Sequence, residues 1–374
     1  ALLEMSVGNF EDAKKYANAA IAKNTAGGDA KPHYALGAID RLEGNSASAI
    51  THLKKALAEN PEDMLSQLEI IGAYLDTQQT EQAEIVLDEL IAKAPNNILA
   101  QFYVAYILAD KGENQAAEDV LLQAGDLLAR YRPAKRLYGH VAYDLEKYDA
   151  AASYLEQYLD AAPTDTETRL ALADTHSKVG RPQEALKVLE PVITGAQKAT
   201  TGNDTDNTDT PPAPLVQGPV IESLARAAAA QQSLGNIDAA RQQYEKAIAL
   251  AQGLEPKDPA LVASLTAVLA SMEYNTGNRD GGLALMSSAT ANDDATTQEL
   301  TTLANMQMIN GKLDDALATA ERLKATDANI VAQNIIGTVE YRRGNYDASV
   351  KALTEAINQN PNYASALKNR ASAY

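Results

Sequence analysis

Small and apolar residues recur at helical spacing along this chain, in segments that close at a proline. In the segment that ends at Pro61, they include Leu36, Ala49, Leu53 and Ala56. Spacings of three and four residues bring such side chains to one face of an α-helix, and proline ends a helix because it has no N–H to donate to the hydrogen-bond ladder. The pattern predicts stacked amphipathic helices.

The closing prolines repeat at a fixed interval. Pro95 follows Pro61 by 34 residues, Pro163 follows Pro95 by twice that number, and Pro361 closes a later segment of the same kind. Such a period is the length of the tetratricopeptide repeat (TPR), a pair of antiparallel helices called A and B here. Glycine suits the turn between them because it adopts positive φ without strain. The unit that begins at Arg132 lacks this glycine.

We therefore expect an all-α protein, a right-handed TPR superhelix, which is an α-solenoid of stacked helix pairs. The turn glycines Gly235, Gly277, Gly311 and Gly344 indicate the later units. Both ends of the sequence fall inside a unit, so we expect the natural protein to extend further in both directions. The expected organisation is one solenoid fragment with units at residues 1–29 (partial), 30–63, 64–97, 98–131, 132–165, 166–194, 221–262, 263–296, 297–329, 330–363 and 364–374 (partial).

Three stretches depart from the regular period. Residues 195–218 are rich in Thr, Asn, Asp and Pro and have too few apolar side chains to order themselves. We expect a disordered acidic loop that protrudes from one solenoid; a partner-binding or regulatory loop and a hinge are the alternatives. Asp258 and Pro259 are expected to start a lengthened helix A. Gly281 and Gly282 stand where the next helix B begins, and each costs roughly 1 kcal/mol of helix propensity, which predicts the softest unit.

Composition narrows the classes of partner. The chain has 45% hydrophobic but only 5% aromatic residues, which suits many small helix contacts better than one thick core. The net charge of −18 repels phosphate, so nucleic acid is not an expected partner. The absence of cysteine from the sequence removes disulfides and thiol chemistry. No apolar run of about 18 residues occurs, so we expect no transmembrane segment in these residues.

The sequence offers no constellation that is typical of an enzyme. Its four histidines, His33, His52, His140 and His176, have no metal-ligand spacing, and His33 and His176 stand at core-type positions of helix A. A phosphate-binding glycine loop, a nucleophile elbow and the zinc motif H-E-x-x-H are all missing. We expect no catalytic residue, no cofactor and no metal.

The concave face of the solenoid is the expected binding surface, for a protein or peptide. Positions 2, 5, 9 and 12 of each helix A line this face in TPR superhelices. Aromatic and Arg side chains usually anchor protein interfaces, although a tyrosine here has the alternative role of filling a gap between helices. The first predicted zone, the aromatic strip, comprises Tyr34, Leu68, Leu75, Phe102, Tyr106, Arg136, His140 and Tyr143. The second, the polar strip, suits a peptide backbone or a sugar chain and comprises Ser271, Tyr274, Asn305, Asn334, Thr338 and Tyr341.

The TPR carboxylate clamp that binds chaperone tails is not expected. It requires Lys and Asn in one unit, Asn in the next, and Lys and Arg in a third. Asn305 matches one position, but Thr301, Ile335, Ser365 and Asn369 occupy the others. Recognition of a terminal carboxylate by this set of side chains is therefore disfavoured.

A closer resemblance is carried by short segments within residues 132–193, which are Arg169–Leu170, Leu172–Ala173, Gly180–Pro182 and Leu189–Glu190–Pro191. Through these segments the chain resembles the long TPR lipoproteins that accompany exosortase/PEP-CTERM exopolysaccharide systems in Gram-negative bacteria. The resemblance implies a periplasmic scaffold that organises exopolysaccharide assembly, export or surface-protein sorting. It also implies an outer-membrane anchor outside these residues, since the lipid-bearing cysteine is absent from them; a cytoplasmic location is the alternative. TPR segments of cellulose and alginate secretion machinery are similar too.

The predicted function is a non-enzymatic protein–protein interaction scaffold. A glycan-binding TPR segment of a polysaccharide secretion protein is one alternative, with a polysaccharide as the partner. The TPR portion of a larger enzyme, such as a glycosyltransferase, is another.

Overall fold

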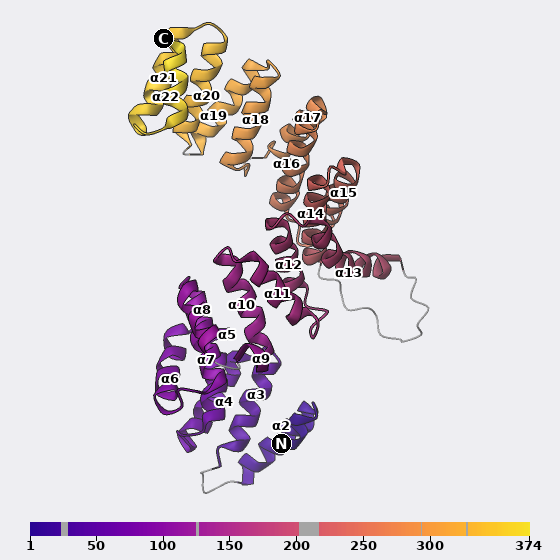
Figure 1. Ribbon diagram of the computed structural model, residues 1–374, viewed down its shortest axis with the longest axis vertical. Helices are drawn as coiled ribbons and strands as arrows, with labels where there is room; N and C mark the ends of the chain where they lie inside the picture. Colours follow the sequence, from indigo (N-terminus) through magenta and orange to yellow (C-terminus); the bar gives the residue numbers. More distant parts are fainter. Residues whose placement is uncertain (24–28, 125–126, 202–216, 293, 327) are drawn as a thin grey trace. The chain divides into compact units, whose positions relative to one another are not determined.

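The structure is a computed structural model that describes residues 1–374 except 24–28, 125–126, 202–216, 293 and 327 (Figure 1). All regular elements in this described part are α-helices. The chain divides into two compact bodies, Ala1–Val179 and Gly180–Tyr374. The prediction of an all-α fold of stacked helix pairs is confirmed.

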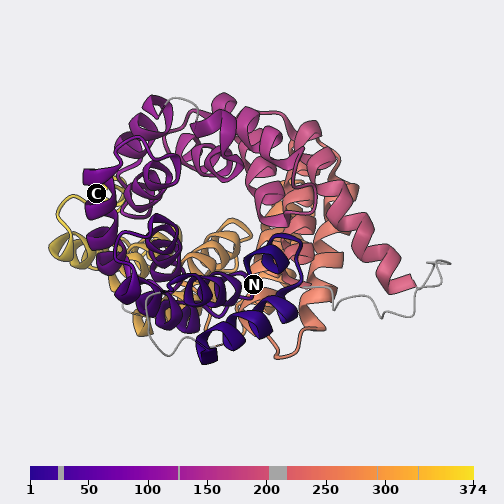
Figure 2. The ribbon, with the colours of Figure 1, turned by 90° about the horizontal axis from the view of Figure 1, so that it is seen from below.

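The first body is built from twelve helices among its described residues. Figure 2 shows its helices, from indigo to magenta, in two layers along a curved path. The A helices touch one another from unit to unit, as α3 with α5, α5 with α7, α7 with α10, and α10 with α12. Because neighbours approach most closely on the inside of a curve, the A helices form its concave layer. The bounds are α1 (Leu2–Ser6), α2 (Phe10–Lys23), α3 (Lys31–Leu42), α4 (Ser46–Glu59), α5 (Met64–Asp76), α6 (Thr80–Lys93), α7 (Ile98–Asp110), α8 (Asn114–Gln123), α9 (Leu127–Arg130), α10 (Arg132–Asp144), α11 (Tyr148–Leu159) and α12 (Thr166–Lys178).

A side-chain cap two residues after the closing proline starts several A helices. The side chains of Asp63, Asn97 and Asp165 accept hydrogen bonds of 3.1, 3.0 and 2.9 Å from the backbone N–H three residues later. Each cap satisfies one of the N–H groups that a helix start leaves without an internal partner, and is worth about 1 kcal/mol. The period seen in the sequence therefore places helix starts as well as helix ends.

The A-to-B turns need a residue in the left-handed region. Glycine occupies it at Gly44 (φ +81°) and Gly112 (φ +76°), but Gln78 (φ +57°) and Glu146 (φ +59°) occupy it in the units that lack glycine. A side chain in this region meets the following carbonyl at a cost of roughly 1 kcal/mol. Packing of the flanking helices holds these two turns in the same conformation as the glycine turns.

The core lies between helices rather than at one centre. In the first body, Leu53, Ile70, Ile71 and Leu90 are fully buried in one cluster that spans α4 to α7. The short helix α9 was not predicted, because four residues carry no periodic signal; its Leu127 is fully buried beside α8 and α10.

The second body contains the remaining helices and follows the same plan. Its bounds are α13 (Pro182–Thr201), α14 (Gln217–Ser233), α15 (Ile237–Gln252), α16 (Pro259–Asn275), α17 (Arg279–Ala289), α18 (Thr297–Ile309), α19 (Leu313–Ala325), α20 (Asn329–Arg342), α21 (Tyr346–Gln359) and α22 (Ala364–Ala373). Successive A helices again touch, as α18 with α20 and α20 with α22.

Two expectations for the start of this body are wrong. Helix α13 passes through Pro191 and does not end with the predicted unit at residue 194 but continues to Thr201, and α14 already begins at Gln217. Only 202–216 of the predicted 195–218 loop therefore lies outside the described residues. Val192 and Ile193 pack against α14, and this packing outweighs the one backbone hydrogen bond that proline removes.

The lengthened helix A that was predicted at Asp258 is confirmed. Asp258 accepts a hydrogen bond of 2.9 Å from the Leu261 N–H, and Pro259 is the first residue of α16. In the following helix α17, Gly282 lies where a Cβ would come within 2.6 Å of the Tyr274 nitrogen and 2.7 Å of the Ala270 oxygen. Backbone contact between α16 and α17 therefore requires glycine at this position.

Candidate functional site

Phe102 on α7 is the centre of the aromatic strip. Its ring packs edge-on against Tyr131, with centroids 4.9 Å apart, and contacts Tyr103 at 5.6 Å and Tyr106 at 6.2 Å. Tyr106 keeps 41% of its surface exposed. Such tilted and edge-to-face pairs hold aromatic rings in place. The structure thus presents an exposed tyrosine on a fixed aromatic base.

The other apolar members of the strip are less accessible. Tyr34 and Leu75 are half-buried against the core of the first body, and Leu68 is only 6% exposed. The prediction that Leu68 lines the binding surface is wrong, because its side chain belongs to the core cluster.

The polar end of the strip lies on α10. Arg136 donates to Thr168 Oγ1 at 3.1 Å and pairs with Glu167 at 2.5 Å, so the start of α12 neutralises its charge. His140 is half-buried, and burial together with the Arg136 charge lowers its pKa. The Tyr143 ring meets Tyr148 edge-on at 5.4 Å. The structure therefore brings these three residues onto one helix, and the charge of Arg136 is paired with a carboxylate of α12.

An ion-pair cluster beside the aromatic strip was not predicted from the sequence. Arg41 on α3 pairs with Asp76 at 2.9 Å and Glu69 at 3.2 Å on α5, and its guanidinium lies against Gly72. Burial raises the pKa of the nearby Tyr103 to about 12, although Arg41 opposes the shift. Arg41 stands at position 12 of its helix A, as do Leu75 and Tyr143 in theirs, and this shared position was a usable signal.

Three members of the polar strip meet in one cavity in the second body. Asn305 on α18 and Asn334 and Thr338 on α20 line a space of about 640 Å³ together with residues of α22, called the amide pocket here. Asn369 on α22 donates to Asn334 Oδ1 and Thr338 Oγ1, both at 3.0 Å. The amide pocket is lined by Thr301, Asn305, Met308, Ile309, Val331, Asn334, Ile335, Thr338, Arg342, Tyr363, Ser365, Lys368 and Asn369.

The remaining members of the polar strip lie elsewhere. Ser271 lines a separate cavity of about 550 Å³ along α16. Tyr341 is exposed and packs edge-on against Tyr346 at 5.8 Å. The expectation that Tyr274 lines a groove is wrong: it is 8% exposed, and its hydroxyl accepts from Asn310 Nδ2 at 2.9 Å. The ring fills the core between α16 and α18, where the hydroxyl finds a partner.

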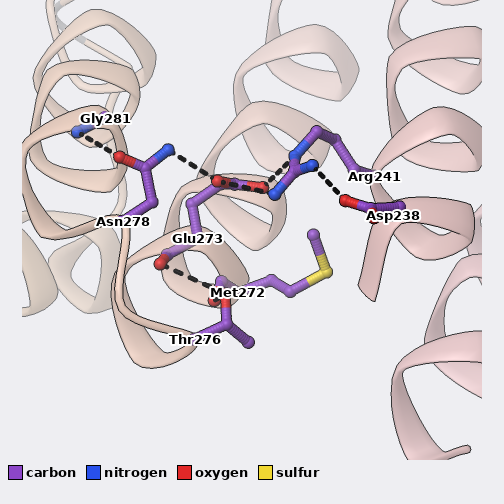
Figure 3. Close-up of polar contacts among 7 residues, drawn as sticks. All are labelled: Asp238, Arg241, Met272, Glu273, Thr276, Asn278 and Gly281. Atoms are coloured by element: carbon purple, nitrogen blue, oxygen red, sulfur yellow. Dashed lines mark hydrogen bonds and ion pairs between the residues drawn. The ribbon is translucent and has the colours of Figure 1, made fainter. Parts of the chain in front are cut away.

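A buried carboxylate joins α15 to α16 in the second body. Figure 3 shows Arg241 with two contacts to Glu273, at 2.5 and 3.2 Å, and one to Asp238 at 2.7 Å. Asn278 donates to Glu273 at 2.7 Å and caps α17 by accepting from the Gly281 N–H. The Arg241 hydrogen bond is the main reason that the pKa of Glu273 is lowered, against the effect of burial. All four charged and amide groups make contacts within the fold, so we assign this network a structural role rather than a role in binding a partner.

Three of the histidines, His33, His52 and His176, also pack within the fold. The rings of His33 and His52 stack with centroids 5.9 Å apart, and His176 is buried with its Nε2 3.4 Å from Glu156. Among the described residues, no group of three or more His, Asp or Glu side chains could hold a metal ion. No helix in the same part of the chain has both the length and the apolar character needed to cross a membrane.

Sequence models of the tetratricopeptide repeat match most of the chain. One matches residues 41–103 and 142–199, a second matches 1–64 and 336–374, and a third matches 221–253. Together they cover well over half of the sequence. No curated protein matches it.

Several solved structures are similar over part of the chain. A thermophilic TPR protein of Thermus thermophilus is 26% identical, with a TM-score of 0.39, covering 46% of this chain and 94% of its own. PilF of Pseudomonas aeruginosa is 17% identical, with a TM-score of 0.45, covering 60% and 93%. PilW, a type IV pilus biogenesis factor, is 14% identical, with a TM-score of 0.49, covering 63% and 97%.

Proposed function

Because the chain belongs to the tetratricopeptide-repeat proteins, we propose that it is a non-enzymatic interaction scaffold that binds a protein segment along the A helices of its first body. The observation that carries this proposal is the exposed Tyr106 on the aromatic base of Phe102 and Tyr131. An aromatic side chain that is already held in place loses little conformational entropy when a partner covers it. The strip is therefore a preorganised anchor.

The acidic side chains beside the aromatic strip indicate which charge the partner segment carries. Glu69 and Asp76 share the single cation of Arg41, and both carboxylates remain partly exposed. The surroundings of the strip are therefore net negative, as the whole chain is. A segment with apolar side chains flanked by Lys or Arg complements this surface.

Loss of the anchor tests the proposal. The double variant Phe102→Ala with Tyr106→Ala removes the exposed ring and its base, and we expect partner recovery in affinity capture from cell envelopes to fall at least about tenfold, as for a central interface residue. Tyr16→Ala is the matched control, because Tyr16 is 50% exposed on α2, a helix outside the strip. Equal recovery with both proteins would exclude the aromatic strip as the binding surface.

For the cellular role, we propose a scaffold of bacterial exopolysaccharide assembly, export or PEP-CTERM protein sorting, located in the periplasm through an outer-membrane anchor outside these residues. The sequence resemblance of residues 132–193 supports this role. A strain that lacks the gene is expected to lose surface polymer or sorted surface protein, and fractionation is expected to find the protein with the outer membrane. Unchanged polymer and surface protein, with the scaffold in the cytoplasm, would contradict this assignment.

A polysaccharide ligand is the second candidate, for the polar strip alone. The observation that favours it is the gathering of amide and hydroxyl groups around Asn305, Asn334 and Thr338. Titration with oligosaccharides of the organism's own polymer tests it, and saturable binding that Asn334→Ala abolishes would establish it.

A further inference from the structure

The amide pocket of the second body differs in charge from the rest of the protein. Asp and Glu outnumber Lys and Arg by 50 to 32 in the sequence, yet none of the thirteen residues that line this pocket in the described structure is acidic, and two, Arg342 and Lys368, are cationic. A cavity with this lining in so acidic a chain is a local site of opposite charge. Such a site attracts anions.

The two cations lack carboxylate partners within the described chain. Neither Arg342 nor Lys368 lies within ion-pair distance of a carboxylate there, and one N–H of Arg342 donates to the Met308 carbonyl at 2.5 Å. The adjacent Arg343 is different, because it pairs with Asp314 and with Glu340 at 3.4 Å. A guanidinium has five N–H donors, so Arg342 keeps donors available for a ligand.

The remaining lining decides what kind of anion fits. Ile309 and Val331 supply apolar surface, while Asn305 and Asn334 supply amides that match a peptide backbone. Only one aromatic ring, Tyr363, belongs to the lining in the described structure, so the stacked aromatic surfaces that sugars favour are not provided. Apolar contacts beside carboxylate partners are what an acidic peptide with intervening apolar side chains requires.

We propose that the amide pocket binds an acidic peptide segment, with its side-chain carboxylates at Arg342 and Lys368 and its backbone at Asn305 and Asn334. The ligand is internal sequence rather than a chain terminus, because the positions of a terminal carboxylate clamp are occupied by Thr301, Ile335, Ser365 and Asn369. The site is separate from the aromatic strip and takes a partner of the opposite charge. The protein would thus hold a basic segment on its first body and an acidic segment on its second.

Titration of the full chain with a defined peptide tests this proposal. The probe is an N-acetylated, C-terminally amidated heptapeptide of alternating Glu and Ala that begins and ends with Glu. Its binding is measured by calorimetry at low and at physiological salt. Its counterpart with Gln in place of Glu has the same shape without charge. We expect saturable binding of the Glu peptide that weakens with salt, and at least about tenfold weaker binding of the Gln peptide. Equal binding of both peptides would overturn the proposal.

Variants assign the binding to this pocket. Arg342→Gln and Lys368→Gln are each expected to weaken binding about two- to fivefold, and together about tenfold. Arg343→Gln makes the same change of charge one residue away and outside the pocket, so it is expected to change affinity by less than about twofold. Asn305→Asp places a negative charge in the pocket at constant volume and is expected to weaken binding like the double variant. An equal loss in Arg343→Gln would mean that only overall charge matters, and would refute the site.

A further arm distinguishes the class of ligand and separates this proposal from the proposed function. Tetragalacturonate carries the same four charges as the peptide, and its tighter binding would replace the peptide assignment by a glycan. Phe102→Ala with Tyr106→Ala is expected to leave the affinity for the acidic peptide unchanged. This proposal rests on the proposed function only in that both binding surfaces lie on A helices. Loss of partner capture would therefore count against the aromatic strip, and loss of acidic-peptide binding would count against the amide pocket, independently of each other.

Discussion

Gly282 is the position where helix propensity and packing oppose each other most sharply. The change Gly282→Ala improves the propensity of α17 by about 1 kcal/mol. It also places a Cβ 2.6 Å from the Tyr274 nitrogen and 2.7 Å from the Ala270 oxygen, nearly 1 Å closer than ordinary contact. Both obstacles are backbone atoms of α16 and cannot rotate away, and such overpacking typically costs about 1–3 kcal/mol. We expect a net loss of about 1–2 kcal/mol, because the helices must separate.

Hydrogen exchange measured by mass spectrometry is the suitable assay, because stacked repeats open locally and a single unfolding midpoint averages over them. Peptides from α16 and α17 are expected to exchange about five- to thirtyfold faster in Gly282→Ala, with little change in α3–α7. Gly253→Ala is the control, since the nearest atom to its Cβ is the Leu250 oxygen at 3.4 Å and its φ of −86° is ordinary. Slower exchange of α17 in Gly282→Ala would refute this reasoning, because it would show that helix propensity outweighs the contact between α16 and α17.

Three further predictions concern turns and titratable groups. Gln78→Gly and Glu146→Gly relieve positive φ and are expected to stabilise the first body by about 0.5–1 kcal/mol each in urea unfolding, whereas Gly112→Ala destabilises it; destabilised Gly variants would refute the assignment of strain. Glu273→Gln is expected to cost about 1–3 kcal/mol at neutral pH. Because the pKa of Glu273 is lowered in the fold, its contribution to stability is present above its unfolded pKa and is lost as pH falls through the folded pKa. The unfolding free energies of wild type and Glu273→Gln should therefore converge in acid, and a difference that stays constant with pH would contradict this. Burial lowers the pKa of His52, so stability should fall as pH drops below about 6.5, its unfolded value, and His52→Gln should flatten that slope in denaturant titrations from pH 7.5 to 5.

The repeat period made the helices predictable because one residue pattern encodes both ends of each unit. A capping side chain follows the closing proline by two residues, so Asp63 and Asp165 start their helices where the period predicts. The short helix α9 has no such pattern and depends on the burial of Leu127. The end predicted for this unit at residue 194 was wrong, because α13 continues through Pro191 to Thr201 and its packing against α14, between residues far apart in the sequence, outweighs the local effect of the proline.

The candidate site was less predictable than the fold for a definite reason. A position along helix A states which face a side chain occupies, but its accessibility depends on the neighbouring unit. Leu68 and Tyr274 occupy predicted concave positions, yet adjacent helices bury both. The amide pocket has the converse explanation: Lys368 and Asn369 come from the last described helix, and only the stacking of α18, α20 and α22 brings them to Asn305.

Site-specific photo-crosslinking tests the central claim, that the A-helix face of the first body binds a protein segment, most directly. A photoreactive phenylalanine replaces Tyr106 in one protein and Tyr16 in another, both are expressed in the native organism, and the cross-linked peptides are identified by mass spectrometry. The account predicts one protein partner, cross-linked through a basic and apolar segment at position 106 and absent at position 16. The same set of cross-linked proteins at both positions, or none at position 106, would contradict it.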